Sequence, residues 1–184
     1  MTGVQTCALP ISGDLTIEGR SLVGLTPKER TLYRKEEAGF VFQFYNLIPD
    51  LTVEENIEVV SDISESPLDL SEVLGALELE PYRRRFPREL SGGQQQRAAI
   101  ARAMIKNPKL LLCDELTGAL DTRSSKNVLQ FVGKMNRQYG TTVVIITHNE
   151  AIAKMADQII WIRDGRVEKS VFNEKKIPAE ELEL

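Results

Sequence analysis

The runs Leu-Leu-Leu-Cys-Asp-Glu at 110–115 and Thr-Thr-Val-Val-Ile-Ile-Thr-His at 141–148 carry the strongest information on the fold. Each contains an apolar stretch of strand length and ends in side chains that can carry chemistry. A helix from about Ser124 to Arg137 fits between them, because its apolar residues fall on one face. Continuous apolar strands separated by helices are typical of a parallel sheet covered on both faces. The sequence therefore predicts an α/β fold with strands at Leu110–Cys113 and Thr142–Thr147.

The regions that flank these runs differ in their pattern of apolar residues and prolines, and we interpret residues 1–184 as a single domain. Residues 12–43 are expected to form a partial antiparallel β region, and residues 44–89 a helical subdomain with several prolines. Residues 90–172 should hold the sheet core and a terminal hairpin. Residues 173–184 form an acidic tail that we expect to be loosely held.

Two short motifs predict where helices begin. Thr26-Pro27-Lys28-Glu29 and Thr52-Val53-Glu54-Glu55 are capping boxes, in which the threonine and the glutamate each satisfy a backbone amide of the first turn. The run Arg83-Arg84-Arg85 is interpreted as a solvated face without a functional role.

Composition excludes several classes of protein. With 42% apolar and 27% charged residues, the chain has the balance of a globular protein. Its net charge of −4 argues against nucleic acid as the main partner, because phosphate binding needs a basic surface. No apolar run approaches the roughly 20 residues that cross a bilayer. The cysteines, Cys7 and Cys113, lack metal-ligand spacing, and Cys113 is expected to be a reduced, buried thiol.

Polar side chains follow both predicted strands at their carboxyl ends, where open parallel sheets place ligands. Asp114 and Glu115 end the first strand and His148 follows the second. One carboxylate could hold Mg²⁺, and the other could position or deprotonate an attacking water. An isolated Asp-Glu pair is, however, more often a solvated strand end, and a lone histidine an ordinary loop residue.

The run Leu90-Ser91-Gly92-Gly93-Gln94 favours the functional interpretation. Its glycines let the backbone approach an anion, Ser91 offers a hydroxyl, and a helix with free amide donors begins immediately afterwards. A plain glycine-rich helix cap remains the alternative for a single motif of this kind.

Together the motifs resemble those of ABC ATPases. Leu-Ser-Gly-Gly-Gln-Gln-Gln-Arg at 90–97 resembles the signature, and 110–115 resembles the Walker B strand. Gly118-Ala119-Leu120-Asp121 is similar to the D-loop, His148 to the switch histidine, and Gln43 to the Q-loop glutamine. The resemblance covers about residues 12–164, and the residues in and around these motifs are most similar to those of the lipoprotein-release and macrolide-efflux branch. It implies a P-loop NTPase-like (RecA-like) parallel sheet with a helical subdomain.

The resemblance assigns one group of residues to the chain's own nucleotide. Asp114 would hold Mg²⁺ through water, and Glu115 would polarise the attacking water. His148 would contact the γ-phosphate of ATP. Gln43 would sense metal and nucleotide while linking to the membrane subunit.

A second group would serve a partner subunit. Ser91, Gly92, Gly93 and Gln94 would bind the ATP held by the opposite protomer, and Asp121 would line the dimer interface. The implied partners are a second ATP-binding subunit, as a homodimer, and a membrane permease, with no nucleic acid. The implied location is cytoplasmic, on the inner face of the cell membrane.

The chain departs from the family in two places. No Gly-x-x-x-x-Gly-Lys-Ser/Thr occurs, so the Walker A unit that cradles phosphates is missing, and the chain alone is expected to be inactive. We interpret residues 1–11 as a non-native leader joined to a truncated coding sequence, with a genuine short paralogue as the alternative. Leu116 stands where the family usually has proline, which should leave Glu115 less restrained.

Three functions stay open on the sequence alone. The chain could be a transport ATPase subunit, a nucleotide-incompetent module that pairs with a complete subunit, or an ABC protein of translation or DNA repair. The third is the weakest, because such proteins normally carry tandem cassettes or large insertions.

Overall fold

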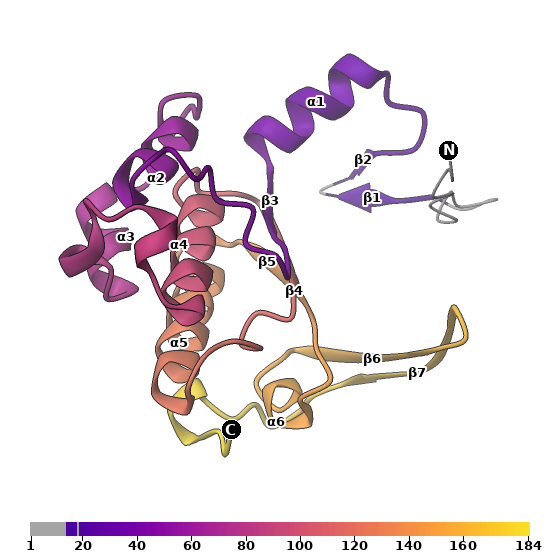
Figure 1. Cartoon of the computed structure of the whole chain (residues 1–184). Helices are drawn as coiled ribbons and strands as arrows, with labels where there is room; N and C mark the ends of the chain where they lie inside the picture. Colours follow the sequence, from indigo (N-terminus) through magenta and orange to yellow (C-terminus); the bar gives the residue numbers. More distant parts are fainter. Residues whose placement is uncertain (1–13, 18) are drawn as a thin grey trace, which may run out of the picture.

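A three-stranded parallel sheet lies at the centre of the computed structural model, which describes residues 14–17 and 19–184. Its strands follow the order β3 (Ala38–Val41), β4 (Leu110–Asp114) and β5 (Thr142–Ile146), as Figure 1 shows. Val41 pairs with Cys113, and Asp114 pairs with Ile146, so the three strands end at one edge. The predicted α/β sheet is confirmed.

The strand β3 corrects the boundary drawn for residues 12–43. An antiparallel pair is present, β1 (Thr16–Ile17) with β2 (Arg20–Ser21), and α1 (Pro27–Glu36) follows it. The next strand, however, joins the parallel sheet instead of the antiparallel region. Gly39 allows this, since a Cβ there would lie 2.8 Å from Leu111 Cδ1 and 2.9 Å from the Ala103 carbonyl. The proposed leader at residues 1–11 lies outside the described residues.

Two long helices cover one face of the sheet. They are α4 (Gly92–Met104) and α5 (Thr122–Tyr139), and their buried residues form a continuous core with alternate residues of β4. Leu111 and Cys113 on that face are 0% and 2% exposed. Burial raises the pKa of the Cys113 thiol to about 12, so the group stays protonated and unreactive near neutral pH.

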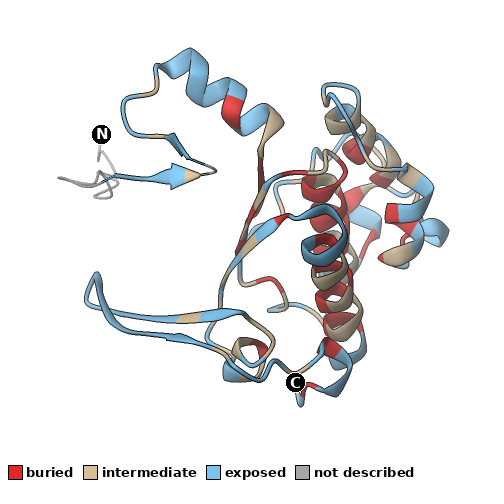
Figure 2. Cartoon of the chain, turned by 180° about the vertical axis from the view of Figure 1, so that it is seen from behind, coloured by how far each residue is buried: buried red, intermediate tan, exposed pale blue. Residues whose placement is uncertain are grey.

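The opposite face of the sheet is open among the described residues. Phe42, Val144 and Ile146 are 49%, 44% and 64% exposed. The prediction that both faces are covered is therefore wrong for this part of the chain. Apolar strand residues predict that a face of the sheet is buried, but they do not identify the segment that covers it. The predicted hairpin is confirmed, with β6 (Gln158–Arg163) and β7 (Arg166–Phe172) projecting from the sheet and exposed along most of their length (Figure 2).

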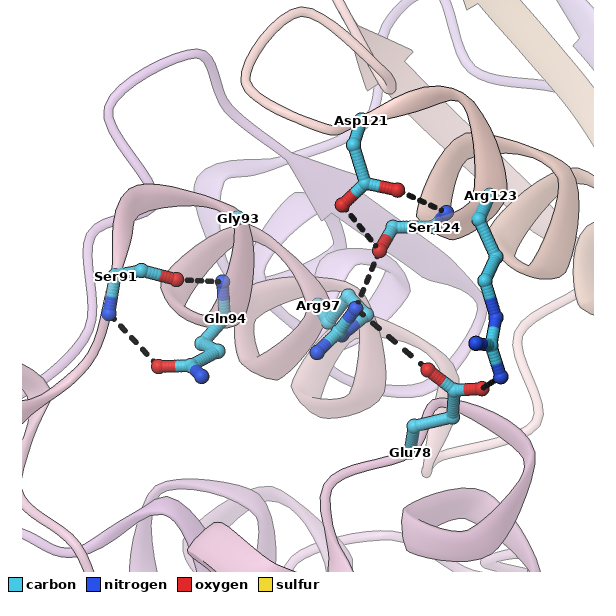
Figure 3. Close-up of a pocket in the computed structure, with 8 residues that line it drawn as sticks. All are labelled: Glu78, Ser91, Gly93, Gln94, Arg97, Asp121, Arg123 and Ser124. Carbon is cyan, nitrogen blue, oxygen red and sulfur yellow. Dashed lines mark hydrogen bonds and ion pairs between the residues drawn. The ribbon is translucent and has the colours of Figure 1, made fainter.

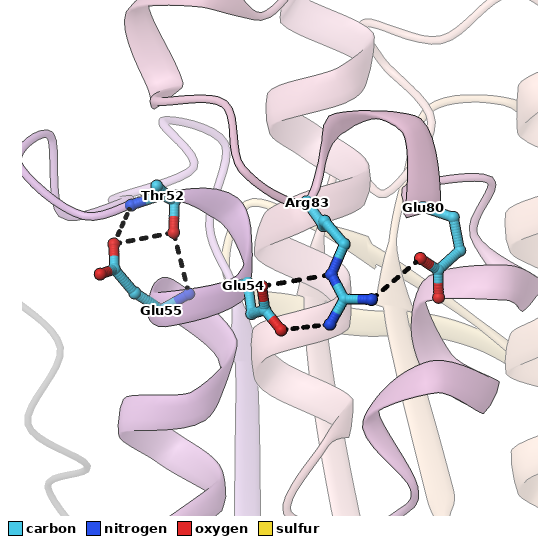
Figure 4. A network of polar contacts seen from close by, with 5 residues as sticks. All are labelled: Thr52, Glu54, Glu55, Glu80 and Arg83. Atoms are coloured by element: carbon cyan, nitrogen blue, oxygen red, sulfur yellow. Dashed lines mark hydrogen bonds and ion pairs between the residues drawn. The ribbon is translucent and has the colours of Figure 1, made fainter.

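The helical subdomain packs against α4. It consists of α2 (Val53–Ser61), α3 (Leu70–Ala76) and the short turns η1 (Glu80–Tyr82) and η2 (Pro87–Glu89). Both predicted capping boxes are present. At the start of α2 the Thr52 amide donates to the Glu55 carboxylate at 2.8 Å, and the Thr52 hydroxyl accepts from the Glu55 amide (Figure 4).

The arginine run is not simply a solvated face. The Arg83 guanidinium donates to both carboxylate oxygens of Glu54 and lies 3.5 Å from Glu80, so it joins α2 to η1 (Figure 4). Arg85 pairs with Glu89 at 3.1 Å. These arginines therefore fix the connections inside the helical subdomain.

The C-terminal tail is also held more firmly than the sequence predicts. A short turn, η3 (Ala179–Glu181), packs on α5, with Ala179 and Leu182 5% and 2% exposed. Lys126 Nζ donates to the Glu180 carbonyl at 2.9 Å. The apolar residues among the acidic ones explain the docking. No helix within residues 14–17 and 19–184, including the short α6 (Glu150–Ala153), is both long and apolar enough to cross a membrane.

Asn56 offers a test of the helical subdomain. This fully buried amide accepts from the Ile48 amide at 2.7 Å and donates to the carbonyls of Ile48, Leu51 and Thr52. We expect Asn56→Leu to lower the free energy of unfolding by about 2–4 kcal/mol, because buried backbone groups lose their partners. Denaturant unfolding measures this. Asn127→Leu, which removes one exposed hydrogen bond, should cost less than about 1 kcal/mol, and equal losses would contradict the assignment.

Candidate functional site

The edge where β4 and β5 end brings Glu115 and His148 into contact. His148 Nδ1 lies 2.8 Å from Glu115 Oε1, with the histidine side chain 86% exposed and the carboxylate 24% exposed. The Glu115 amide donates to the Ile146 carbonyl at 3.0 Å, which ties this residue to the end of β5. The two side chains predicted from separate motifs therefore form one polar pair that faces outward.

The chemistry of this pair follows from its hydrogen bond. An ionised carboxylate only accepts, so in that state the proton of the bond lies on His148 Nδ1. The imidazole Nε2 is then left for a ligand at the open edge. Glu115 keeps a second carboxylate oxygen, which can accept a proton or a hydrogen bond from water. The pair can thus orient a water beside an anionic group.

Asp114 and Gln43 belong to the same edge. Asp114 is exposed at the end of β4, and Gln43 follows Val41, which pairs with the residue before Asp114. Their side chains offer the oxygen ligands that Mg²⁺ prefers. Within the described part of the chain, no three acidic, histidine or cysteine side chains gather into a metal-binding group.

The signature and D-loop residues line a different site, a cavity of about 410 Å³ at the start of α4 (Figure 3). It opens between the beginnings of α4 and α5, beside the last turn before η1. Its walls are polar and carry both signs of charge. The lining residues are Glu78, Ser91, Gly93, Gln94, Arg97, Asp121, Arg123 and Ser124.

The first turn of α4 presents donors to this cavity. The Ser91 hydroxyl accepts from the Gln94 amide at 3.3 Å, and the Gln94 side chain accepts from the Ser91 amide at 2.8 Å. The Ser91 O–H can still donate, because the hydroxyl accepts and donates independently. A Cβ on Gly93 would lie 3.2 Å from the Ala119 carbonyl, so this glycine lets α4 lie against the D-loop. The geometry suits an anion.

A chain of hydrogen bonds fixes Asp121 on the other wall. Asp121 caps α5, accepting from the Ser124 amide and hydroxyl at 2.9 Å each, and these bonds hold the pKa of Asp121 below its usual range. Arg97 in turn donates to the Ser124 hydroxyl at 2.7 Å. Arg97 is 8% exposed, and its Nε has no hydrogen-bond partner within the part of the chain that the structure describes. The same terminal nitrogen that donates to Ser124 lies 4.0 Å from Glu78 Oε2 (Figure 3).

The structure thus sorts the residues singled out from sequence into two places. Asp114, Glu115 and His148 share the strand edge, while Ser91, Gly93, Gln94 and Asp121 share the cavity; Gly92 adjoins the cavity without lining it. The sequence interpretation missed several polar residues that support these places. Two of them, Gln96 and Arg97, stand inside the signature run, whereas Glu78, Arg123 and Ser124 carry no motif.

Comparison with protein families matches residues 4–118 to the ABC transporter family. The match begins within residues 1–11, the segment interpreted above as a leader. It ends just after the loop that carries Glu115, so it includes the signature and the end of β4. The chain belongs to the ABC transporter family.

Individual relatives agree with this assignment. The chain is 38% identical over 172 residues to an uncharacterised ABC transporter ATP-binding protein of Mycobacterium tuberculosis, covering 91% of this chain and 69% of the relative. It is 43% identical over 164 residues to the macrolide export ATP-binding/permease protein MacB of Escherichia coli, covering 86% and 25%. An ABC transporter ATP-binding protein of Mycoplasma pneumoniae is 40% identical, with 86% and 35% covered. The chain spans 69%, 25% and 35% of the length of these three relatives, respectively.

Solved structures place the fold more narrowly. The ATP-binding cassette MJ0796, described as dimeric in a post-hydrolysis state with ADP and Pi, superposes with a TM-score of 0.81 at 37% identity. The alignment covers 90% of this chain and 75% of that one. A second dimeric structure of the same bacterial ABC transporter cassette gives a TM-score of 0.82. The P-loop NTPase-like fold expected from the motifs is confirmed.

Proposed function

We propose that this chain is the ATP-hydrolysing subunit of an ABC transporter, acting with a second copy of itself and a membrane permease on the cytoplasmic face of the membrane. The observation that carries the proposal is the 2.8 Å contact between Glu115 and His148 at the end of β4 and β5. It places a base and an orienting imidazole side by side at the edge where open parallel sheets bind their ligands.

In hydrolysis, Glu115 would orient the attacking water and take a proton from it. The bond between the water oxygen and the γ-phosphorus would form as the bond from the γ-phosphorus to the β,γ-bridging oxygen breaks, which leaves ADP and phosphate. The His148 Nδ1–H bond fixes the direction of that carboxylate, and Nε2 would donate to a γ-phosphate oxygen when it carries a proton as well, in the imidazolium form. Asp114 and the Gln43 side-chain oxygen would hold Mg²⁺ at the same edge. The ion would supply neutralisation of the charge on the phosphate oxygens.

The second site supports a dimer. The cavity lined by Ser91, Gly93 and Asp121 is formed by helix starts, separately from the strand edge that carries Glu115. A head-to-tail pair of subunits with twofold symmetry would bring each cavity against the partner's strand edge and create two composite sites. The solved dimer of the cassette MJ0796 with ADP and Pi supports this arrangement.

The loop after Gln43 supports contact with a permease. Phe44 is 81% exposed, and the next two residues, Tyr45 and Asn46, have φ values of 45° and 50°. Arg102 of α4 donates to both of their carbonyls, at 3.0 and 2.7 Å. An apolar side chain on a backbone held this way suits a protein partner. The relative MacB is described as a macrolide export protein, which is one example of a transported substrate. The substrate that this chain helps to transport has to be identified by a transport assay.

Turnover tests the proposal. The 184-residue polypeptide should not hydrolyse ATP above background, because its sequence contains no Gly-x-x-x-x-Gly-Lys-Ser/Thr to cradle phosphate. A "loop-extended protein", in which the strand–phosphate loop–helix unit of an ABC relative precedes residue 14, should hydrolyse ATP at about 0.1–10 s⁻¹, and chelation of Mg²⁺ should abolish this. Turnover by the 184-residue polypeptide that disappears on Glu115→Gln would refute the first expectation. A loop-extended protein that binds ATP without turnover would favour a nucleotide-incompetent module instead.

A further inference from the structure

Gln96 makes an unusual set of contacts for a residue on the signature helix. The side chain is 3% exposed and reaches from α4 to the loop that follows β4. Its Nε2 donates to the carbonyls of Glu115 and Leu116 at 2.9 and 2.8 Å, and its Oε1 accepts from the Ala119 amide at 3.2 Å. Both N–H groups and the carbonyl oxygen are therefore used within a single loop.

The backbone that Gln96 holds is strained. Glu115 has a φ of 54°, in the left-handed region that costs a non-glycine residue about 1 kcal/mol or more. Such a conformation persists only where surrounding contacts enforce it. Besides Gln96, these contacts include the Gly118 amide, which donates to the Glu115 carbonyl at 3.1 Å, the bond from the Glu115 amide to the Ile146 carbonyl at 3.0 Å, and the fully buried Leu116 side chain. Gln96 and the burial of Leu116 therefore restrain Glu115, and the weaker restraint expected relative to a proline at 116 stays a prediction.

The same helix end borders the cavity described above. Ser91 and Gly93 line it one turn before Gln96, and Arg97, the next residue, reaches Asp121 through Ser124. One turn of a rigid helix thus holds both ends of the segment from Glu115 to Asp121. A shift of α4 on occupation of the cavity would move the Glu115 backbone with it.

We propose that Gln96 is a positioning residue that holds Glu115 in its left-handed conformation and couples the cavity at the start of α4 to the Glu115–His148 pair. The coupling would let a nucleotide bound by the partner adjust the water-orienting carboxylate of this subunit. That second step rests on the proposed function, whereas the positioning of the backbone does not.

Hydrogen exchange in the 184-residue chain tests the positioning directly. In Gln96→Met, which keeps the length and removes all three hydrogen bonds, the protection factors of the Ala119 and Gly118 amides should fall at least about tenfold. Amides in the middle of α5 should change by less than a factor of about two. Gln95→Met is the matched control. Within residues 14–17 and 19–184 the Gln95 side chain donates to the Leu90 carbonyl, at 3.2 Å, and not to the loop after β4, so Ala119 should stay protected.

Gln96→Glu adds a readout that a packing role would not move. The ionised carboxylate would face two carbonyl oxygens, and this together with burial raises its pKa. Once protonated, the group can donate to one carbonyl again. Protection of the Gly118 amide, which donates to the Glu115 carbonyl, should therefore recover in Gln96→Glu as the pH is lowered from about 8 to about 6 and be lost as it rises again. Gln96→Met should show no such recovery.

Kinetics of the loop-extended protein test the coupling. Gln96→Met should lower kcat by about 10–100-fold and change KM for ATP by less than about twofold, because Gln96 is 3% exposed and does not line the cavity. For Gln96→Glu, kcat divided by the kcat of the unsubstituted protein at the same pH should rise as the pH falls. Unchanged Ala119 protection, an equal loss at all amides, or a local loss with unaltered kcat would each overturn the proposal. A loop-extended protein without turnover would sink the proposed function, and the exchange data would still decide the positioning.

Discussion

Glu115→Gln in the loop-extended protein should lower ATP turnover by about 10³-fold, while ATP binding remains close to that of the unsubstituted protein. The amide keeps the size of the side chain and can still accept from His148 Nδ1, so the 2.8 Å contact survives. It removes the negative charge that orients and activates water. Because ATP is bound but not hydrolysed, the protein should accumulate as a dimer, which gel filtration with ATP and Mg²⁺ would detect.

Glu150→Gln provides the matched control. Glu150 is an exposed glutamate in the first turn of α6, two residues after His148, so Glu150→Gln makes the same change from carboxylate to amide outside the proposed site. Its turnover should stay within about twofold of the unsubstituted protein. If Glu115→Gln neither slows turnover nor accumulates a dimer, the base must be sought in another residue.

Ser91→Arg should block hydrolysis only when it sits opposite an intact phosphate loop. Consider a mixed dimer of two loop-extended subunits, one of them with its loop lysine replaced by alanine. Ser91→Arg in that loop-dead subunit faces the partner's intact loop, so turnover should fall at least about 10²-fold. Ser91→Arg in the loop-intact subunit faces the dead loop and should leave the remaining site working.

Both arrangements contain the same substitutions, so differences in folding cancel. Ser91 caps α4, and replacing it should cost each mixed dimer the same ~1 kcal/mol or so. ATP affinity of the isolated monomer should not change, because the cavity at Ser91 lies apart from the chain's own strand edge. Equal turnover in the two arrangements, or a parallel loss of monomer affinity, would show that the site is not shared between subunits.

Much of the architecture follows from local sequence. The apolar runs at 110–113 and 142–146 form neighbouring parallel strands, and the threonine capping boxes begin helices where expected. Asp114, Glu115 and His148 could be placed at one edge because parallel strands end together. That argument needs only strand order and direction, both of which periodicity and motif spacing supply.

Other features depend on contacts that no local pattern records. Gln96 looks like any polar residue of a helix until the fold brings the loop after β4 within 3 Å of its amide. Glu78 reaches the cavity only because the helical subdomain packs beside α5. The acidic composition of residues 173–184 predicts a loosely held tail, yet the buried side chains of Ala179 and Leu182 anchor this tail to the core.

The register of the sheet has a consequence for the order of folding. Leu110 pairs with both Ala38 and Thr142, but the first pairing spans more than twice as much chain as the second. Closing the longer loop costs more entropy and requires the intervening helical subdomain to be accommodated. The β4–α5–β5 unit can therefore assemble first, and β3 docks onto a preformed edge. Glu115 and His148 would then meet early, in the most locally connected part of the molecule.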